Sequence, residues 1–470
     1  MSKRVRVLLV LALVVAGLGT GILTASAQGG RTWVSGIMIQ NQSTTDVANI
    51  TVIFYWDQAH GGAEAHRFSD TIDPGKAKSY YVPSAGETSG LPEGFIGSAV
   101  VSSDQPVAAN VNTQVPVSEG SLPGLPTRVG TSSGVLVPST YLYFPQLMKE
   151  YSGWNSYIAV QNTASSSASV TVQYYDAAGT LVATDTKAVG PYTTYIFRQS
   201  ENVSLSNGFV GSAKVTGTQE LAGICNFYNS ENTHTEAQFH SYNAFSGGHT
   251  LLNVPRVVKD YWGYQSGLMV QNVGTSATTV TVTYYFGGST YTETSPSIGP
   301  NAAWGVYLGN PAAGVAGASG SGSAIIESSG QPIVAIINED NRTVGFGSTY
   351  NAFLSGEESA TVLCPQVTAK YYGYCGGIQV QNVGTSTASL TITYSMAGRP
   401  DVTKFGTAAP GGSYSAFAPN EVAADFNGSV IVTSNQPIVG IANMAYNQTV
   451  DPRYGAQYGD SFTTNNGINK

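Results

Sequence analysis

One stretch recurs four times along the chain, and this repeat restricts the fold more than any other feature. Residues 270–285 read VQNVGTSATTVTVTYY and residues 380–394 read VQNVGTSTASLTITY, and more divergent copies occur at 160–175 and 39–55. In each copy a Gln-Asn pair is followed by a short polar turn and then by alternating apolar and polar residues. Alternation with a period of two is typical of a β-strand with one buried face. The repeat therefore predicts four similar β-rich modules.

Turn motifs recur in the same order within each copy. A Pro-containing turn is followed by a Gly-Ser or Gly-Ser-Ala step, with its glycine at Gly97, Gly211, Gly322 and Gly428. We expect these glycines to mark β-bulges or close backbone approach. An asparagine ends the first repeated strand, and asparagine side chains are well suited to capping turns. These residues are Asn41, Asn162, Asn272 and Asn382.

The spacing of the strands predicts the fold class. If the segment between modules is counted as a first strand, each module has about seven strands in roughly 110 residues, which favours an immunoglobulin-like β-sandwich. No stretch has a sustained helical period, so we expect almost no helix. We predict an all-β chain of four tandem immunoglobulin-like antiparallel β-sandwich modules, elongated and on the order of 150 Å long.

The expected divisions of the chain follow from the repeat and from composition. Residues 115–138 are rich in Pro, Gly and Ser, so we expect a hinge between the first module and the other three. The predicted divisions are a secretory signal peptide at 1–27, module 1 at 28–114, the linker at 115–138, module 2 at 139–247, module 3 at 248–356, and module 4 with a polar tail at 357–470.

The first half of each copy resembles a family of bacterial and archaeal extracellular adhesion modules, the CARDB-like immunoglobulin-like repeats. The family pattern is a strand ending in N-x-G, a polar turn, a V-T-V-x-Y-Y strand and a P-G-x-S turn. Residues 271–274, 280–285 and 410–413 match it best, and the match covers about half of each module. The resemblance implies a secreted protein with tandem β-sandwich repeats that is displayed at the cell surface and binds something, without indicating the ligand.

The N-terminus has the features of an export signal. Three basic residues precede a short apolar run that ends in Ala25-Ser26-Ala27, which predicts cleavage between Ala27 and Gln28. Without those bases the chain has 17 Lys and Arg against 28 Asp and Glu, a formal charge of −11. A nucleic-acid surface needs clustered Lys and Arg, and this chain has no such cluster. We expect a secreted, extracellular or cell-surface protein that binds neither nucleic acid nor, after cleavage, the membrane.

The residue types used in catalysis and metal binding show no recognised arrangement. The one G-x-S-x-G, at 130–134, lies in the predicted linker, whereas a nucleophile elbow needs a strand before it and a helix after it. The five histidines match no standard zinc spacing, and we expect them in solvated loops. Cys364 and Cys375 are close enough in sequence to form a disulfide, and Cys225 reads as a buried apolar residue. We expect a protein that is not an enzyme and has no cofactor or metal.

Aromatic residues cluster in the segments that link the modules, and they are the candidate contact residues. Exposed Tyr and Trp can stack on sugar rings, but the same residues could pack one module against the next. Both alternatives stay open from sequence. The residues are Tyr151 and Trp154, then Tyr261, Trp262 and Tyr264, then Tyr371, Tyr372 and Tyr374.

These features together favour a structural spacer, fibre subunit or adhesin of the cell surface or extracellular matrix. The alternative is a glycan-binding adhesin or accessory module that uses the linking aromatics. Module 1 lacks a linking strand in the sequence, so its sheet edge is a candidate for pairing with another copy. The expected partners are therefore the protein itself, by strand-edge or end-to-end assembly, or glycans of the cell envelope.

Overall fold

The computed structural model describes residues 7–11, 33–82, 86–92, 94–115, 121–122, 125–229, 238–310, 313–341, 343–454 and 459–470. The predicted cleavage site, Ala27 and Gln28, lies outside these residues. The described chain is almost entirely antiparallel β-structure, which confirms the predicted all-β class. Its helical segments are single turns: α2 (Ala418–Glu421), η1 (Gln58–His60), η2 (Gly86–Thr88) and η3 (Gln199–Glu201).

Every module is a sandwich of two antiparallel layers, and the order of strands repeats from module to module. In module 1 one sheet has the order β1-β6-β3-β4 and the other has the order β10-β7-β2-β5. A small hairpin, β8 (Ser121–Leu122) and β9 (Leu125–Pro126), precedes β10. The strands of the two sheets are β1 (Val7–Leu11), β2 (Val34–Asn41), β3 (Ala48–Trp56), β4 (Glu64–Ile72), β5 (Ala77–Val82), β6 (Gly97–Ser103), β7 (Val107–Val115) and β10 (Arg128–Ser133).

Module 2 differs from module 1 in that one long strand, β16, passes from one layer to the other, as β32 (Phe426–Tyr446) does in module 4. It pairs with β11 and β13 in its first half and with β12 and β17 in its second half. The strands are β11 (Ser139–Lys149), β12 (Asn155–Asn162), β13 (Ala168–Asp176), β14 (Leu181–Val189), β15 (Thr194–Arg198), β16 (Phe209–Tyr228) and β17 (Phe239–Asn243).

Modules 3 and 4 repeat the same two layers. In module 3 they are β18 (Leu251–Lys259), β19 (Gln265–Asn272), β20 (Val280–Phe286), β21 (Ser289–Thr294), β22 (Ala303–Tyr307), β23 (Gly320–Ser328), β24 (Ile333–Asn341), β25 (Phe346–Asn351) and β26 (Phe353–Leu354). In module 4 they are β27 (Ser359–Ala369), β28 (Tyr374–Asn382), β29 (Ala388–Ser395), β30 (Val402–Ala408), β31 (Ser413–Phe417), β32 (Phe426–Tyr446), β33 (Thr463–Asn466) and β34 (Ile468–Asn469).

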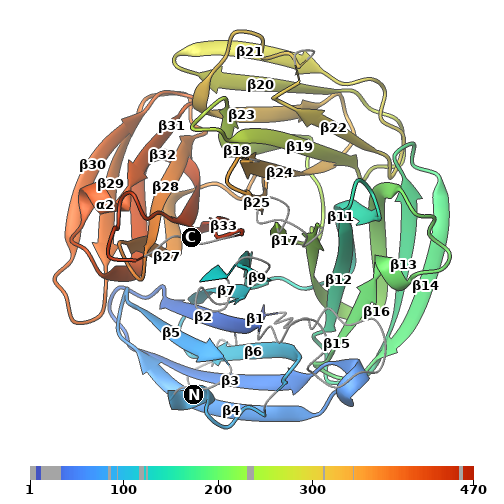
Figure 1. Cartoon of the computed structure of the whole chain (residues 1–470), viewed down its shortest axis with the longest axis horizontal. Coiled ribbons are helices and arrows are strands. Elements are labelled where there is room, and N and C mark those ends of the chain that lie inside the picture. Colours follow the sequence, from blue (N-terminus) through green and yellow to red (C-terminus); the bar gives the residue numbers. More distant parts are fainter. Residues whose placement is uncertain are drawn as a thin grey trace.

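The four modules form a closed ring, so the predicted elongated chain is wrong. Figure 1 shows the first module beside the fourth, with β17, β25 and β33 near the centre. The Lys76 ammonium of module 1 lies 2.6 Å from the Asp401 carboxylate of module 4, and the Asn112 amide donates to Gln366 at 2.6 Å. Apolar cores also continue across interfaces, since the core of module 2 includes Val334 of module 3.

One hydrogen bond recurs at all four interfaces. The serine of each Gly-Ser step is fully buried, and its hydroxyl donates to a carbonyl oxygen in the Pro-containing turn of the next module. The four bonds are Ser98 to Tyr192 at 3.3 Å, Ser212 to Asn301 at 2.7 Å, Ser323 to Gly411 at 2.7 Å, and Ser429 to Gly75 at 3.4 Å. Because the last bond returns to module 1, the four bonds close the modules into a cycle.

The repeated asparagine and glycine have the structural roles that the sequence predicted. The Asn272 amide donates to the carbonyls of Ser276 and Ile298 at 2.8 and 2.9 Å, and its oxygen accepts from the Gly274 N–H. The asparagine thereby holds the turn that docks on the neighbouring module. A Cβ on Gly322 would collide with the backbone oxygen of Tyr285, and the three equivalent glycines face the same constraint.

Two segments of module 1 depart from the prediction. Arg128–Ser133, expected in a flexible linker, forms β10 and pairs with β7. Val7–Leu11, expected in the export signal, forms β1 and pairs with β6. It takes the place that β11, β18 and β27 occupy in the other modules. The edge that we expected to be uncovered is therefore paired in this structure.

Candidate functional site

The linking aromatics are carried by three equivalent tight turns, which form the candidate site. In module 3 the turn runs from Tyr261 to Tyr264, whose backbones exchange hydrogen bonds of 3.2 and 2.9 Å. Its central residues have positive φ, 54° at Trp262 and 83° at Gly263. Positive φ at both central positions is typical of a type I′ turn, which suits the twist of a hairpin. The turns at 151–154 and 371–374 have the same bonds and the same backbone conformation.

The tip of the turn is strained where it carries an aromatic residue. Trp262 is 84% exposed and Tyr372 is 63% exposed, and both are in the left-handed region. A bulky side chain in this conformation costs about 1–2 kcal/mol, and strain of this kind concentrates at functional sites. Module 2 has Ser152 at the same position with φ 49°. The aromatic tips therefore belong to modules 3 and 4.

The last aromatic of each turn has a different environment from the tip, because it is half-buried against the middle of the ring. The ring centroid of Trp154 lies 5.2 Å from His240, that of Tyr264 lies 5.1 Å from Phe462, and that of Tyr374 lies 5.9 Å from Tyr446. Tyr264 thus packs against a residue of the next module.

The first aromatic of each turn is partly exposed beside the tip. Tyr151 is 43% exposed and Tyr261 is 36% exposed, and Tyr371 meets Tyr372 edge to face at 4.8 Å. The packing between modules that the sequence left open as one alternative is therefore found at Tyr264. The last position packs inward, while the tip and the first position face solvent.

Two polar groups support the turn of module 3. The Asn341 amide donates to the Trp262 carbonyl at 2.9 Å. The Arg256 guanidinium lies 5.9 Å from the centre of the Tyr261 ring, where a cation–π attraction operates. Arg256 is itself held by the Glu339 carboxylate, with N–O distances of 2.8 and 3.0 Å. This buried ion pair was not found from sequence, because its partners are 83 positions apart and the other modules lack it.

The turn of module 4 is supported differently. The Arg453 guanidinium donates to the Lys370 carbonyl at 2.5 Å and pairs with the carboxylates of Asp425 and Asp451. The ring of Tyr454 lies 6.0 Å from that of Tyr372. Hydrogen bonds from Arg453 lower the pKa of Asp451, so this carboxylate is charged at neutral pH. The backbone of both aromatic turns is therefore held by neighbouring side chains.

The turns of modules 2, 3 and 4 lie at one end of the ring axis, because the strand after each turn is in register with the start of an inner strand, β17, β25 or β33. The buried Asp460 carboxylate accepts from the Phe239 N–H at 3.1 Å and from the Gly347 N–H at 3.0 Å, and thereby joins three modules. Burial raises the pKa of Asp460 well above its usual range. Tyr264 packs beside this junction, against Phe462.

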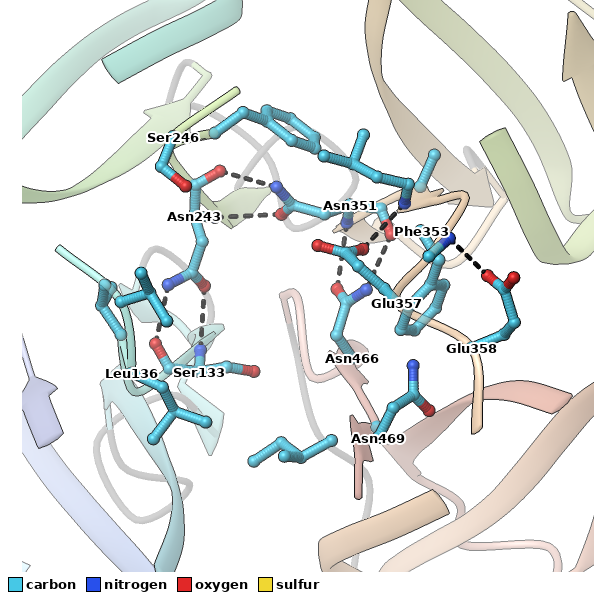
Figure 2. A pocket seen from close by; sticks show the side chains of 18 of the residues that line it. Ser133, Leu136, Asn243, Ser246, Asn351, Phe353, Glu357, Glu358, Asn466 and Asn469 are labelled. Atoms are coloured by element: carbon cyan, nitrogen blue, oxygen red, sulfur yellow. Dashed lines mark hydrogen bonds between the residues drawn. The ribbon is translucent and has the colours of Figure 1, made fainter. Parts of the chain in front are cut away.

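The other end of the axis is a depression of about 530 Å³ (Figure 2). Its floor is a ladder in which Asn466, Asn351 and Asn243 each bridge to the backbone of the preceding inner strand. Each side-chain amide donates to a backbone carbonyl at 2.7 Å. The side-chain oxygens accept from backbone N–H groups at 3.0, 3.1 and 3.0 Å. Ser133 ends the ladder in module 1. Glu357 and Glu358 accept from backbone N–H groups of the same loop. The three asparagines of the ladder thereby join neighbouring modules, whereas the two glutamates hold a loop within module 3.

The cysteines are buried, and so is one of the histidines that the structure describes. All three cysteines are buried free thiols, so the predicted Cys364–Cys375 disulfide is absent here. The burial of Cys225 is confirmed. His240 is buried in β17 and bonds to Thr349, contrary to the expected solvated loop. Across the part of the chain that the structure describes, no three metal-binding side chains gather, and no helix is long and apolar enough to cross a membrane.

Comparison with known proteins gives short structural matches. No family model and no curated protein matches the chain. Among solved structures, protein 1070 of Thermotoga maritima is 16% identical and matches over 24% of this chain and 95% of its own, with a TM-score of 0.19. The sensory rhodopsin transducer of Anabaena is 17% identical and matches over 17% of this chain and 90% of its own, with a TM-score of 0.15.

Proposed function

We propose that the protein is a non-catalytic, exported adhesin that binds glycans through the aromatic turns at one end of its ring. The observation that carries this proposal is Trp262, an 84% exposed indole on a left-handed backbone. An exposed aromatic in a strained conformation is retained where the ring itself makes the functional contact. Stacking on the apolar face of a pyranose is the contact that such a ring makes best.

The spacer or fibre hypothesis has less support. It depended on four modules placed end to end, whereas the ring returns module 4 to module 1 through contacts such as Lys76 with Asp401. A closed ring has little reach but presents several modules in fixed relative positions. That geometry suits binding at more than one point.

The test is a glycan array probed with the full chain and with its variants Trp262→Ala and Tyr372→Ala. We expect binding to at least one class of glycan and its loss in the variants. Tyr141→Ala is the matched control, because Tyr141 is 42% exposed and lies near the start of β11, away from the turns. The proposal fails if no glycan is retained, or if the turn variants bind as well as the original. Light scattering of the same samples would detect self-association, the competing function.

A further inference from the structure

Two neighbouring modules carry an aromatic tip, and this restricts the kind of glycan. Trp262 and Tyr372 occupy the same position of equivalent turns in modules 3 and 4, whereas module 2 has Ser152 there. The modules are joined by buried contacts, including the Ser323 hydroxyl to the Gly411 carbonyl at 2.7 Å. The two tips are therefore held at a fixed separation.

The backbone that carries each tip is also held within its own module. Asn341 holds the Trp262 carbonyl, and Arg453 holds the backbone at Lys370 beside Tyr372. A backbone that is already ordered loses little conformational entropy on binding. Two ordered platforms on a rigid frame can engage one long ligand, and the second contact is then intramolecular. A linear polymer would gain from this arrangement, and a short sugar would not.

The charges around the tips restrict the ligand further. Beside Trp262, the exposed Asp260 carboxylate pairs at 3.2 Å with Lys259, whose side chain is only 15% exposed. Beside Tyr372, Arg453 is balanced by Asp425 and Asp451. The hydrogen bond from Gln265 and then Lys259 lower the pKa of Asp260, so this group stays ionised near neutral pH. Neither tip therefore offers the excess of positive charge that sulfate or uronate groups require.

We propose that Trp262 and Tyr372 are two subsites for one linear, uncharged polysaccharide that spans modules 3 and 4. This inference rests on the proposed glycan binding and gives it a substrate class. The polymer stacks a sugar ring on each tip, and the carboxylate of Asp260 and nearby backbone groups accept hydrogen bonds from its hydroxyls. Polyanionic glycans are excluded by charge.

The test is calorimetric titration of the exported chain with a short and a long oligosaccharide of the same neutral glycan, with polygalacturonate and with heparin. The neutral glycan is the one with the strongest signal on the array. We expect the long chain to bind about 100-fold tighter than the short one. Trp262→Ala or Tyr372→Ala removes that gain, and Tyr141→Ala keeps it.

The outcomes separate this inference from the proposed function. Equal affinity for short and long chains would overturn the two-subsite arrangement while glycan binding stands. Preference for polygalacturonate or heparin would overturn the neutral class, again without affecting glycan binding. An array on which the original protein binds no glycan, followed by no binding of polygalacturonate or heparin, would overturn both.

Discussion

The Arg256–Glu339 pair makes a quantitative prediction, because it is a buried interaction with a built-in comparison. The side chains are 11% and 1% exposed. The guanidinium also donates to Gln379 of module 4 at 3.1 Å. Glu339→Gln keeps the shape but removes the negative charge, which leaves a buried guanidinium unpaired. Removing one partner of a buried pair costs about 3–5 kcal/mol.

Module 2 supplies the matched control. Gln146 and Phe227 occupy the positions equivalent to Arg256 and Glu339. Phe227 pairs with Ser156 as Glu339 pairs with Ser266, and Gln146 follows a proline as Arg256 does. The double variant Arg256→Gln, Glu339→Phe therefore replaces the ion pair by the uncharged glutamine and phenylalanine that module 2 has at these positions. We expect it to recover more than half of the stability lost in Glu339→Gln.

The assay is urea unfolding followed by circular dichroism, with limited proteolysis to detect module 3 opening before the rest. A four-module chain need not unfold in one step, so the transition that includes module 3 is the one compared. The reasoning is refuted if Glu339→Gln changes this transition by less than about 1 kcal/mol. It is also refuted if the double variant is no more stable than the single one.

Three further predictions concern His240, the turn tips and the repeated glycine. Burial lowers the pKa of His240 to about 3, so the unfolded chain takes up a proton below its usual value of about 6.5 and the folded chain does not. Lowering the pH from about 6.5 to about 3 should therefore reduce the free energy of unfolding by about 1.4 kcal/mol per pH unit through this group. Unfolding at several pH values should show that His240→Gln lacks this contribution. Trp262→Gly should raise the free energy of unfolding by up to about 1 kcal/mol while abolishing glycan binding, whereas Ser152→Gly should stabilise without loss of binding. Gly322→Ala should destabilise by about 1–3 kcal/mol because its Cβ meets backbone, and Gly299→Ala, with ordinary contacts, should be near neutral in the same measurement.

Much of the local structure was predictable, because it depends on short-range rules. The alternating segments became strands such as β13 and β20, and Asn272 caps its turn as asparagine at a strand end is expected to do. The linking aromatics were identified as the candidate site. Their division into an inward ring and a solvent-exposed tip was not, because it depends on a type I′ backbone whose only sequence signal is the Gly at the third position.

The inner strands were the main omission. Tyr242-Asn243-Ala244-Phe245 recurs as Tyr350-Asn351-Ala352-Phe353, a signal that identifies the strand ends bearing the asparagine ladder. The ladder itself joins residues about 110 positions apart. Contacts at that separation depend on how modules turn relative to each other, and alternation within one module carries no information about this.

The sequence alone determined a chain of four β-sandwich modules, since burying one face of an alternating strand requires a second sheet in the same module. Only the tertiary structure decided that the modules close into a ring. The deciding groups are hydroxyls and carbonyls at module edges, such as Ser429 and Gly75, which would bond to water equally well in a rod. Their bonds form across interfaces because each module is turned by a similar angle from the last, and four such turns bring module 4 back to module 1 (Figure 1).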